Sequence, residues 1–170
     1  MTDIPTIQTE RLSLRPIKLE DWPAYVELMH SQRSEYMGGP YSTKVAWGIF
    51  CHDVAQWSLM GHGALMIEDR GTGVCHGQVG INHGPLFPEC ELGWFVYSGS
   101  EGKGYAFEAA QALRNWAFQT RRLKTLVSYM DPNNIKSRRL AEKLGAQLDV
   151  NAVRDDPNDL VFRHPNTSNV

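Results

Sequence analysis

The order of its predicted strands and helices places this chain of 170 residues in the α/β (α+β) class. Apolar–polar alternation typical of strands gives way repeatedly to the three- and four-residue apolar spacing of amphipathic helices. One apolar segment runs through a glycine-rich turn directly into a helix, as many strand–helix junctions do. No internal repeat or linker interrupts the pattern, so we expect residues 1–170 to form a single domain.

The first third of the chain predicts one strand and two helices. Residues 10–15 alternate apolar and polar side chains and end at Pro16, which predicts a strand. Residues 19–31 and 44–60 carry aromatic and aliphatic side chains at helical spacing, which predicts two amphipathic helices. The segment 36–41 between them contains Gly-Gly-Pro and predicts a loop.

The rest of the chain predicts three strands, a helix, a strand, a second helix and a closing pair of strands. The expected bounds are 64–68, 74–81 and 91–97 for the strands, 105–119 for the helix, 125–129, then helix 134–144, and finally strands 147–150 and 160–163. The order is therefore β-α-α-β-β-β-α-β-α-β-β. Residues 166–170 are expected to be a frayed tail.

The segment ELGWFVYSGSEGKGYA, residues 91–106, is the most informative part of the sequence. A strand that turns through glycines into a helix presents free backbone N–H groups at the positive end of the helix dipole, where a phosphate binds favourably. Gly102 and Gly104 allow close approach to the backbone. The spacing does not fit the nucleotide-binding loop GxxxxGK[ST], because Gly104 follows Lys103 and no glycine lies five residues before Gly102. It does not fit a GxGxxG dinucleotide loop either, because Phe107 takes the third glycine position and the region twenty residues on is basic, not acidic.

The loop instead resembles the (Q/R)-x-x-G-x-(G/A) motif of the GNAT N-acetyltransferase superfamily, matching it at Gly104 and Ala106 and departing from it at Glu101. ERLSLRP, ELGW, the N-x-x-S of NNIKS, and EKLGA are similar to motifs of the RimJ/RimL-like subgroup. The resemblance covers most of the chain. It implies a mixed central sheet flanked by helices, and acetyl-coenzyme A as the acetyl donor.

The resemblance also implies which residues hold the donor. The backbone of the strand at 94–96 would pair with the pantetheine arm, the glycine loop would bind the pyrophosphate, and the late helix would meet the sulfur and the adenosine 3′-phosphate. For each basic residue of that helix, an ordinary solvated position is the alternative. The expected donor-binding residues are Trp94, Phe95, Val96, Glu101, Gly102, Lys103, Gly104, Tyr105, Ala106, Asn134, Ser137, Arg139 and Lys143.

Glu91 and Ser137 are the expected catalytic residues. An amine is mostly protonated at pH 7 and must lose a proton before it attacks. Glu91 lies in the strand where the family commonly places its base; a bystander role is the alternative, with Glu89 in reserve. Ala141 stands where many family members carry a tyrosine that acts as the acid. Ser137 would instead hydrogen-bond the leaving sulfur, and Tyr129 is a second candidate for this role. A helix start capped by Asp131-Pro132 would instead make Ser137 a routine first-turn residue.

Charge is distributed unevenly, and this favours a cationic acceptor. Residues 100–145 hold nine Lys/Arg and four Asp/Glu, a balance of +5, and the remainder holds eight against fifteen, a balance of −7. We therefore expect a primary amine, either a protein N-terminal α-amine or a small amine. The loops at 36–41 and 83–88 would line its pocket. The expected substrate-binding residues are Tyr36, Tyr41, His83 and Phe87.

Other function classes fit the composition less well. Three cysteines without CxxC spacing indicate neither a disulfide framework nor a zinc knuckle, so we expect no metal. Cys51-His52 and Cys75-His76 could in principle join Cys90 around a metal ion, but buried thiols beside ordinary histidines are the expected interpretation. Without a signal peptide or an apolar run of about 18 residues, a cytoplasmic monomer or homodimer is expected. A nucleic-acid partner is not expected, because there is no arginine-rich run. A non-catalytic acetyl-CoA-binding module remains the alternative.

Overall fold

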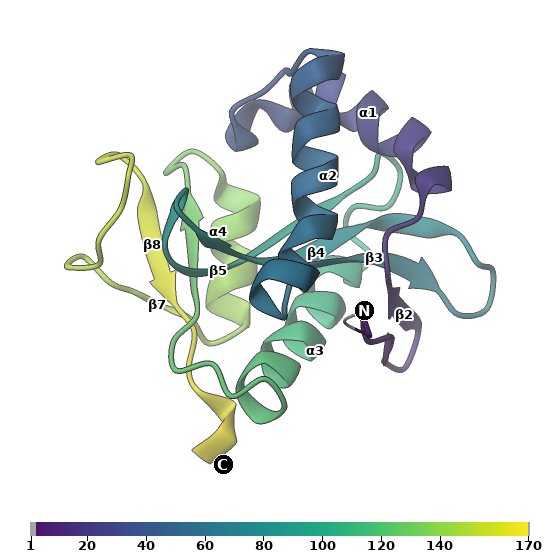
Figure 1. Ribbon diagram of the computed structural model, residues 1–170. Helices are drawn as coiled ribbons and strands as arrows, with labels where there is room; N and C mark the ends of the chain where they lie inside the picture. The colour runs from purple at the N-terminus through teal and green to yellow at the C-terminus, as the bar shows by residue number, and fades with distance from the viewer. Residues whose placement is uncertain (1–2, 170) are drawn as a thin grey trace.

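The computed structural model describes residues 3–169, and these residues form an eight-stranded sheet in the order β1-β2-β3-β4-β5-β6-β8-β7. Every neighbouring pair is antiparallel except β5 and β6, which are parallel. Helices cover the sheet, with α1 and α2 toward the top of the view in Figure 1 and α3 toward the bottom. The predicted fold class, a mixed sheet flanked by helices, is confirmed.

The strands and helices have the following bounds. The strands are β1 (Ile7–Gln8), β2 (Leu12–Arg15), β3 (Ala64–Asp69), β4 (Cys75–Gly84), β5 (Phe87–Val96), β6 (Val127–Met130), β7 (Gln147–Leu148) and β8 (Leu160–Arg163). The helices are η1 (Leu19–Asp21), α1 (Trp22–His30), η2 (Gln32–Met37), α2 (Thr43–Met60), α3 (Tyr105–Gln119), α4 (Ile135–Lys143) and η3 (Thr167–Asn169). None of the helices within residues 3–169 is long and apolar enough to span a membrane.

The predicted element order holds, with four local differences. The first strand is preceded by a short extra strand, β1, which pairs back onto β2. The loop predicted at 36–41 begins within η2, which includes Tyr36 and Met37 and is capped by Gly38 with a left-handed φ of 97°. Strand β5 begins at Phe87, earlier than expected, because the chain reverses tightly between Gly84 and Phe87. In the predicted tail, η3 lies beside α3, and Val170 is outside the described residues.

The two faces of the sheet carry different side chains. Val79 and Ile81 of β4 join the apolar cluster that packs against α3. Gln78 faces the other way and donates a hydrogen bond to Asp53 of α2. Because side chains alternate along a strand, Asn82 belongs to the α2 face as well. A second apolar cluster, built around Tyr25 and Phe50, packs α1 against α2 on that face.

Strands β5 and β6 diverge soon after they meet. Their ladder contains the single pair Glu91–Val127, whereas β6 and β8 pair over four residues. The hydroxyl of Ser128 donates to the carbonyl oxygen of Leu92 at 2.5 Å, next to the point of divergence. Beyond it, the edge of β5 that faces β6 has no strand partner among the described residues. This opening positions the candidate active site.

Candidate active site

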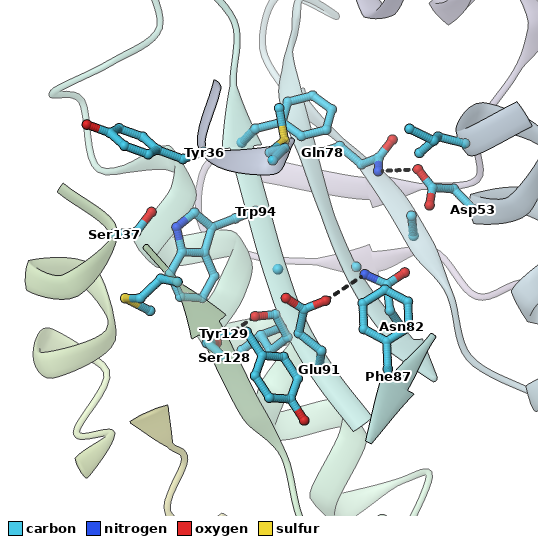
Figure 2. Close-up of a pocket in the computed structure, with 18 of the residues that line it drawn as sticks. Tyr36, Asp53, Gln78, Asn82, Phe87, Glu91, Trp94, Ser128, Tyr129 and Ser137 are labelled. Carbon is cyan, nitrogen blue, oxygen red and sulfur yellow. Dashed lines mark hydrogen bonds between the residues drawn. The ribbon is translucent and has the colours of Figure 1, made fainter. Parts of the chain in front are cut away.

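A cavity of about 380 Å³ lies at the divergence, between the α1–η2–α2 segment, β4, β5, β6 and the first turn of α4. The described residues that line it include no Lys, Arg or His. Its ionisable carboxylates come from α2, β5 and the loops that follow β6 and β7: Asp53, Glu91, Asp131, Asp155 and Asp159. We call it the acid-lined cavity (Figure 2).

Glu91 projects into the acid-lined cavity, where its Oε2 accepts a hydrogen bond from Asn82 Nδ2 at 3.1 Å. Burial raises the pKa of this carboxyl to about 7, and the negative charges of Asp159 and Asp53 act in the same direction. The Asn82 hydrogen bond and the backbone of Tyr129 oppose the rise. A carboxylate with a pKa near neutrality can both accept and release a proton at working pH, as a general base must.

Glu89, the alternative candidate for the base, is hydrogen-bonded through its carboxylate to residues outside the acid-lined cavity. Both of its carboxylate oxygens accept hydrogen bonds from Arg163 at 2.9 Å, and Thr125 donates a third at 3.1 Å. The Arg163 hydrogen bonds lower its pKa, so it remains ionised and paired. The geometry therefore favours Glu91.

Asp53 is a cavity residue that the sequence analysis missed. It lies on the buried face of α2, accepts hydrogen bonds from Gln78 Nε2 at 2.8 Å and from Tyr25 at 3.3 Å, and burial raises its pKa to about 6. A sequence signal did exist, because Asp53 falls on the apolar stripe of α2 between Phe50 and Trp57, where a charged residue requires a special reason.

The phosphate loop, residues 98–104, has the backbone that the glycines predicted. Gly99, Gly102 and Gly104 have φ values of 84°, 72° and 81°, in the left-handed region that glycine adopts without penalty. Gly104 is the N-cap of α3, and its carbonyl accepts from Glu108 N–H at 3.1 Å. Helix geometry leaves the preceding N–H groups without intrahelical partners. The turn is exposed at residues 102–104, and a Cβ at Gly102 would meet no atom within 4 Å.

Side chains from β4 and from the residue that precedes β2 hold the phosphate loop in place. The ring of His76 stacks on Tyr105, the first residue of α3, with centroids 4.1 Å apart. His76 Nδ1 lies 2.8 Å from the hydroxyl of Ser100 within the loop. Arg11 donates to the carbonyl oxygen of Lys103 at 3.0 Å and places its guanidinium over the Tyr105 ring. The loop is therefore preformed.

Glu101, where the family motif prefers Gln or Arg, forms a latch with η2. Its carboxylate pairs with the guanidinium of Arg33 and also accepts from the Gly99 N–H at 2.8 Å. Arg33 donates in addition to the carbonyl oxygen of Val96 at 2.8 Å. The same helix carries Tyr36 to the acid-lined cavity, so this latch connects the phosphate loop to the cavity wall. Arg33 was not anticipated from the sequence.

The first turn of α4 corrects one interpretation. Asn134, not Asp131, is the N-cap, and its side chain accepts from Ser137 N–H at 3.2 Å. Asp131 accepts from Asn133 N–H at 2.7 Å in a turn that precedes the helix. Ser137 lines the cavity, and its hydroxyl makes no hydrogen bond to residues 3–169. Tyr129 lines the cavity too, but its hydroxyl accepts from Glu89 N–H and points away from Trp94 in Figure 2.

The other expected site residues fall into three groups. Tyr36, Tyr41, Phe87, Trp94 and Phe95 line the acid-lined cavity. His83 does not; it lies on the opposite face of the sheet beside His62 and Cys90. Arg139 and Lys143 are exposed on α4, and Lys143 Nζ sits 4.2 Å from the centroid of the Phe107 ring, beside a hollow of about 430 Å³ that Gly104 also lines.

Comparison with known proteins places this geometry in context. The family model described as an acetyltransferase (GNAT) domain matches residues 11–147. The N-acetyltransferase YnaD of Bacillus subtilis is 28% identical over 148 residues, which cover 82% of this chain and 81% of that protein.

Solved structures agree with the sequence comparison. An acetyltransferase from Agrobacterium tumefaciens is 59% identical, with a TM-score of 0.94 over 96% of this chain and 95% of that one. RimL, a ribosomal L7/L12 alpha-N-protein acetyltransferase solved with coenzyme A, shares the fold at 16% identity and a TM-score of 0.73, over 96% of this chain and 99% of RimL.

Proposed function

Because the chain belongs to the GNAT acetyltransferase family, whose members are acyltransferases that use acetyl-CoA, we propose that it acetylates a primary amine by direct attack on the donor thioester. The observation that carries this proposal is Glu91. Its carboxylate, with a pKa raised to about 7, lies in the acid-lined cavity at the divergence of β5 and β6. That position adjoins both the free edge of β5 and the first turn of α4.

The residues around the divergence fit acetyl-CoA as the donor. The preformed phosphate loop, residues 98–104, offers N–H groups and no side-chain bulk to a pyrophosphate. The free edge of β5 at Trp94–Val96 would hydrogen-bond the amide arm and the thioester oxygen. Asn134 caps the helix that brings Ser137 to the cavity. Arg139 and Lys143 are exposed cations of α4, and they would meet the 3′-phosphate.

Three groups of this chain would perform the transfer. Acetyl-CoA supplies the acetyl group through its thioester. Glu91 accepts a proton from the ammonium group, through a water molecule, so that the amine nitrogen can bond to the thioester carbon. The backbone N–H groups of β5 stabilise the oxygen as negative charge develops there. As the carbon–sulfur bond breaks, the Ser137 hydroxyl donates a hydrogen bond to sulfur.

The cavity wall indicates the class of acceptor. With five carboxylates and no described cationic residue, the lining attracts an ammonium group and repels a carboxylate-bearing molecule. Tyr36, Tyr41 and Phe87 add aromatic surface, on which cations bind well. An α-amine, with a pKa of about 8, loses its proton to Glu91 more easily than a lysine side chain, with a pKa of about 10.4. We therefore favour a protein N-terminal α-amine or a small amine.

An acetylation screen tests this function. Peptide N-termini, polyamines, amino acids and aminoglycosides are offered with acetyl-CoA, and free thiol release and product mass are measured. Glu91→Gln, which keeps the Asn82 hydrogen bond, is the matched control. We expect turnover on a carboxylate-poor α-amine or small amine that the control lacks. Exclusive transfer to lysine side chains or hydroxyl groups would contradict the substrate class. Donor binding without any turnover would favour a non-catalytic module.

A further inference from the structure

A cluster of two histidines and one cysteine lies on the face of the sheet opposite Glu91. His62 precedes β3, His83 ends β4 and Cys90 belongs to β5. One ligand atom from each lies within 4.8 Å of the others, and among residues 3–169 this is the one such group of His, Cys, Asp or Glu. We propose that His62, His83 and Cys90 bind one Zn²⁺ ion.

His62 is oriented as a metal ligand. Its Nδ1 lies 3.0 Å from the carbonyl oxygen of Ile81. A carbonyl can only accept, so Nδ1 carries the proton and Nε2 keeps its lone pair. Metal-bound histidines are fixed in the same way, by donating the other N–H to a carbonyl or carboxylate.

The β4–β5 hairpin brings the other two ligands to His62. Cys90 Sγ lies 4.0 Å from His62 Nε2. The ladder between β4 and β5 is irregular between Asn82 and Gly84, and the His83 N–H donates to Gln56 at 3.1 Å instead of to β5. Such an irregularity re-aims the side chain at the bulge. The His83 ring consequently faces His62, with centroids 6.5 Å apart.

The distances fit a zinc site after a small contraction. With Zn–S of about 2.3 Å and Zn–N of about 2.0–2.1 Å in a tetrahedron, the sulfur and nitrogen ligands are about 3.5 Å apart. Cys90 Sγ and His62 Nε2 are 4.0 Å apart and all three ligand atoms lie within 4.8 Å of one another, so small rotations of the side chains would close the site. At 4.0 Å a thiol–imidazole hydrogen bond is at its outer limit, so internal hydrogen bonding does not account for the cluster.

The donor set determines the metal. Two imidazoles and a thiolate suit Zn²⁺ and disfavour Mg²⁺ and Ca²⁺, which prefer oxygen ligands. On binding, the Cys90 thiol releases its proton and the resulting thiolate bonds to zinc, while the fourth position stays open to water.

A bound ion would also fix the backbone behind Glu91. Cys90 precedes Glu91 in β5, and His83 follows Asn82 in β4. The hydrogen-bonded pair Asn82–Glu91 therefore projects from the same two strands to the other face of the sheet. Zinc would connect this hairpin to the end of α2 through His62. This inference does not depend on the proposed acetyl transfer.

Metal titration of the full, reduced chain tests the site. Zn²⁺ is titrated against a chelator of known affinity, and Co²⁺ serves as a spectroscopic probe whose near-ultraviolet charge-transfer band requires a thiolate ligand. We expect one zinc per chain, release of the thiol proton, a cobalt–thiolate band and a higher Tm with zinc. Cys90→Ser should abolish the band and weaken zinc binding roughly 100-fold or more.

Two further variants keep the test decisive. Cys51→Ser removes an exposed thiol on α2 and should leave the band and the affinity unchanged. His83→Gln removes a ligand without touching a cysteine and should weaken zinc binding as Cys90→Ser does, even if one of the two variants folds poorly. The proposal is wrong if the wild-type chain shows no saturable zinc binding, or if Cys90→Ser and His83→Gln bind zinc as the wild type does.

Discussion

The acid-lined cavity lies along β5 and the phosphate loop follows the end of that strand, but the two are built from different parts of the chain. The phosphate loop is backbone: three left-handed glycines and the first N–H groups of α3, all within one short segment. The acid-lined cavity is built from side chains of α1, η2, α2, β4, β5, β6 and the loops around β7. A donor common to a whole family can be held by backbone, whereas the acceptor is selected by side chains that can vary.

The largest effect we expect is on the cavity side. Glu91→Gln keeps the size of the side chain and the Asn82 hydrogen bond but removes the base. The kcat/KM for the amine should fall about 10²–10⁴-fold, while acetyl-CoA affinity stays within error of wild type, since the two regions act separately. Steady-state kinetics and calorimetry measure the two quantities. Equal losses in both would show that Glu91 supports the donor site.

The next largest effect that we expect is a loss of acetyl-CoA affinity when the backbone of the phosphate loop is altered. A side chain at Gly104 would need a φ of 81° and would approach Arg11 Nη2 to 3.3 Å. Gly104→Val should weaken acetyl-CoA binding about 100-fold, because about 3 kcal/mol is lost with one or two N–H contacts to phosphate, each contributing about 1.5–3 kcal/mol.

A matched control separates the effect of backbone strain from the loss of contacts to acetyl-CoA. Gly73 has a φ of 72° in the exposed β3–β4 turn, and a Cβ there would meet nothing within 4 Å. Gly73→Val therefore carries a similar backbone penalty far from the site. We expect comparable losses of Tm in the two variants and normal acetyl-CoA affinity in Gly73→Val. If both variants bind acetyl-CoA equally well, the phosphate loop is not the donor site.

The differing construction also explains how much the sequence could predict. Helix α3 was predicted with its observed bounds, and the phosphate loop was predicted from Gly102 and Gly104, because a turn into a helix is a local feature. Glu91 was chosen by family resemblance. Its raised pKa depends on burial and on the negative charges of Asp159 and Asp53, and only the folded chain provides these surroundings.

The errors have the same origin. His83 was expected in the pocket because its loop precedes Glu91, but strand alternation and an irregular ladder place it on the opposite face. Arg33 was missed because nothing near it in sequence signals a partner at Glu101. The alternative helix start at Asp131-Pro132 is not the one found, because Asn134, equally suited by type, is the N-cap. Contacts between distant segments decide each of these cases.

Ser137 lines the acid-lined cavity from the first turn of α4, and we expect an intermediate effect there. Ser137→Ala should lower kcat roughly 10- to 100-fold, more than it weakens acetyl-CoA binding, because a hydrogen bond to sulfur strengthens as charge develops. Asn134→Ala is the control, since losing the cap should cost about 1 kcal/mol of stability. Urea unfolding should show that loss in Asn134→Ala only. A loss of stability with unchanged kcat in Ser137→Ala would make the residue structural.

The cavity should also affect stability in a pH-dependent way. The pKa of Glu91 is about 7 in the folded chain against 4.5 normally, so the native state binds more protons between these values and wild-type stability falls as pH rises through them. Glu91→Gln escapes this loss. It should be more stable than wild type by about 2 kcal/mol at pH 8, with the difference shrinking toward pH 5. Urea unfolding at both pH values checks this; a constant difference would contradict it.

The smallest effect concerns the latch between the two regions. Glu101→Gln removes a negative charge beside the expected pyrophosphate and weakens the pairing with Arg33. Because exposed charges interact weakly, we expect acetyl-CoA affinity to rise only about two- to fivefold. Calorimetry at low and moderate salt measures the gain, which should diminish with salt. Weaker binding of acetyl-CoA would show that Glu101 itself supports the loop.

The pH dependence of kcat/KM for the best amine tests the central claim most directly. Wild type and Glu91→Gln are compared from about pH 5 to about pH 9, where the ionisations of the free enzyme and the amine both appear. If Glu91 is the base, wild-type kcat/KM rises with pH through an ionisation near 7, and Glu91→Gln retains only the ionisation of the amine. An ionisation near 7 that persists in Glu91→Gln would contradict the account.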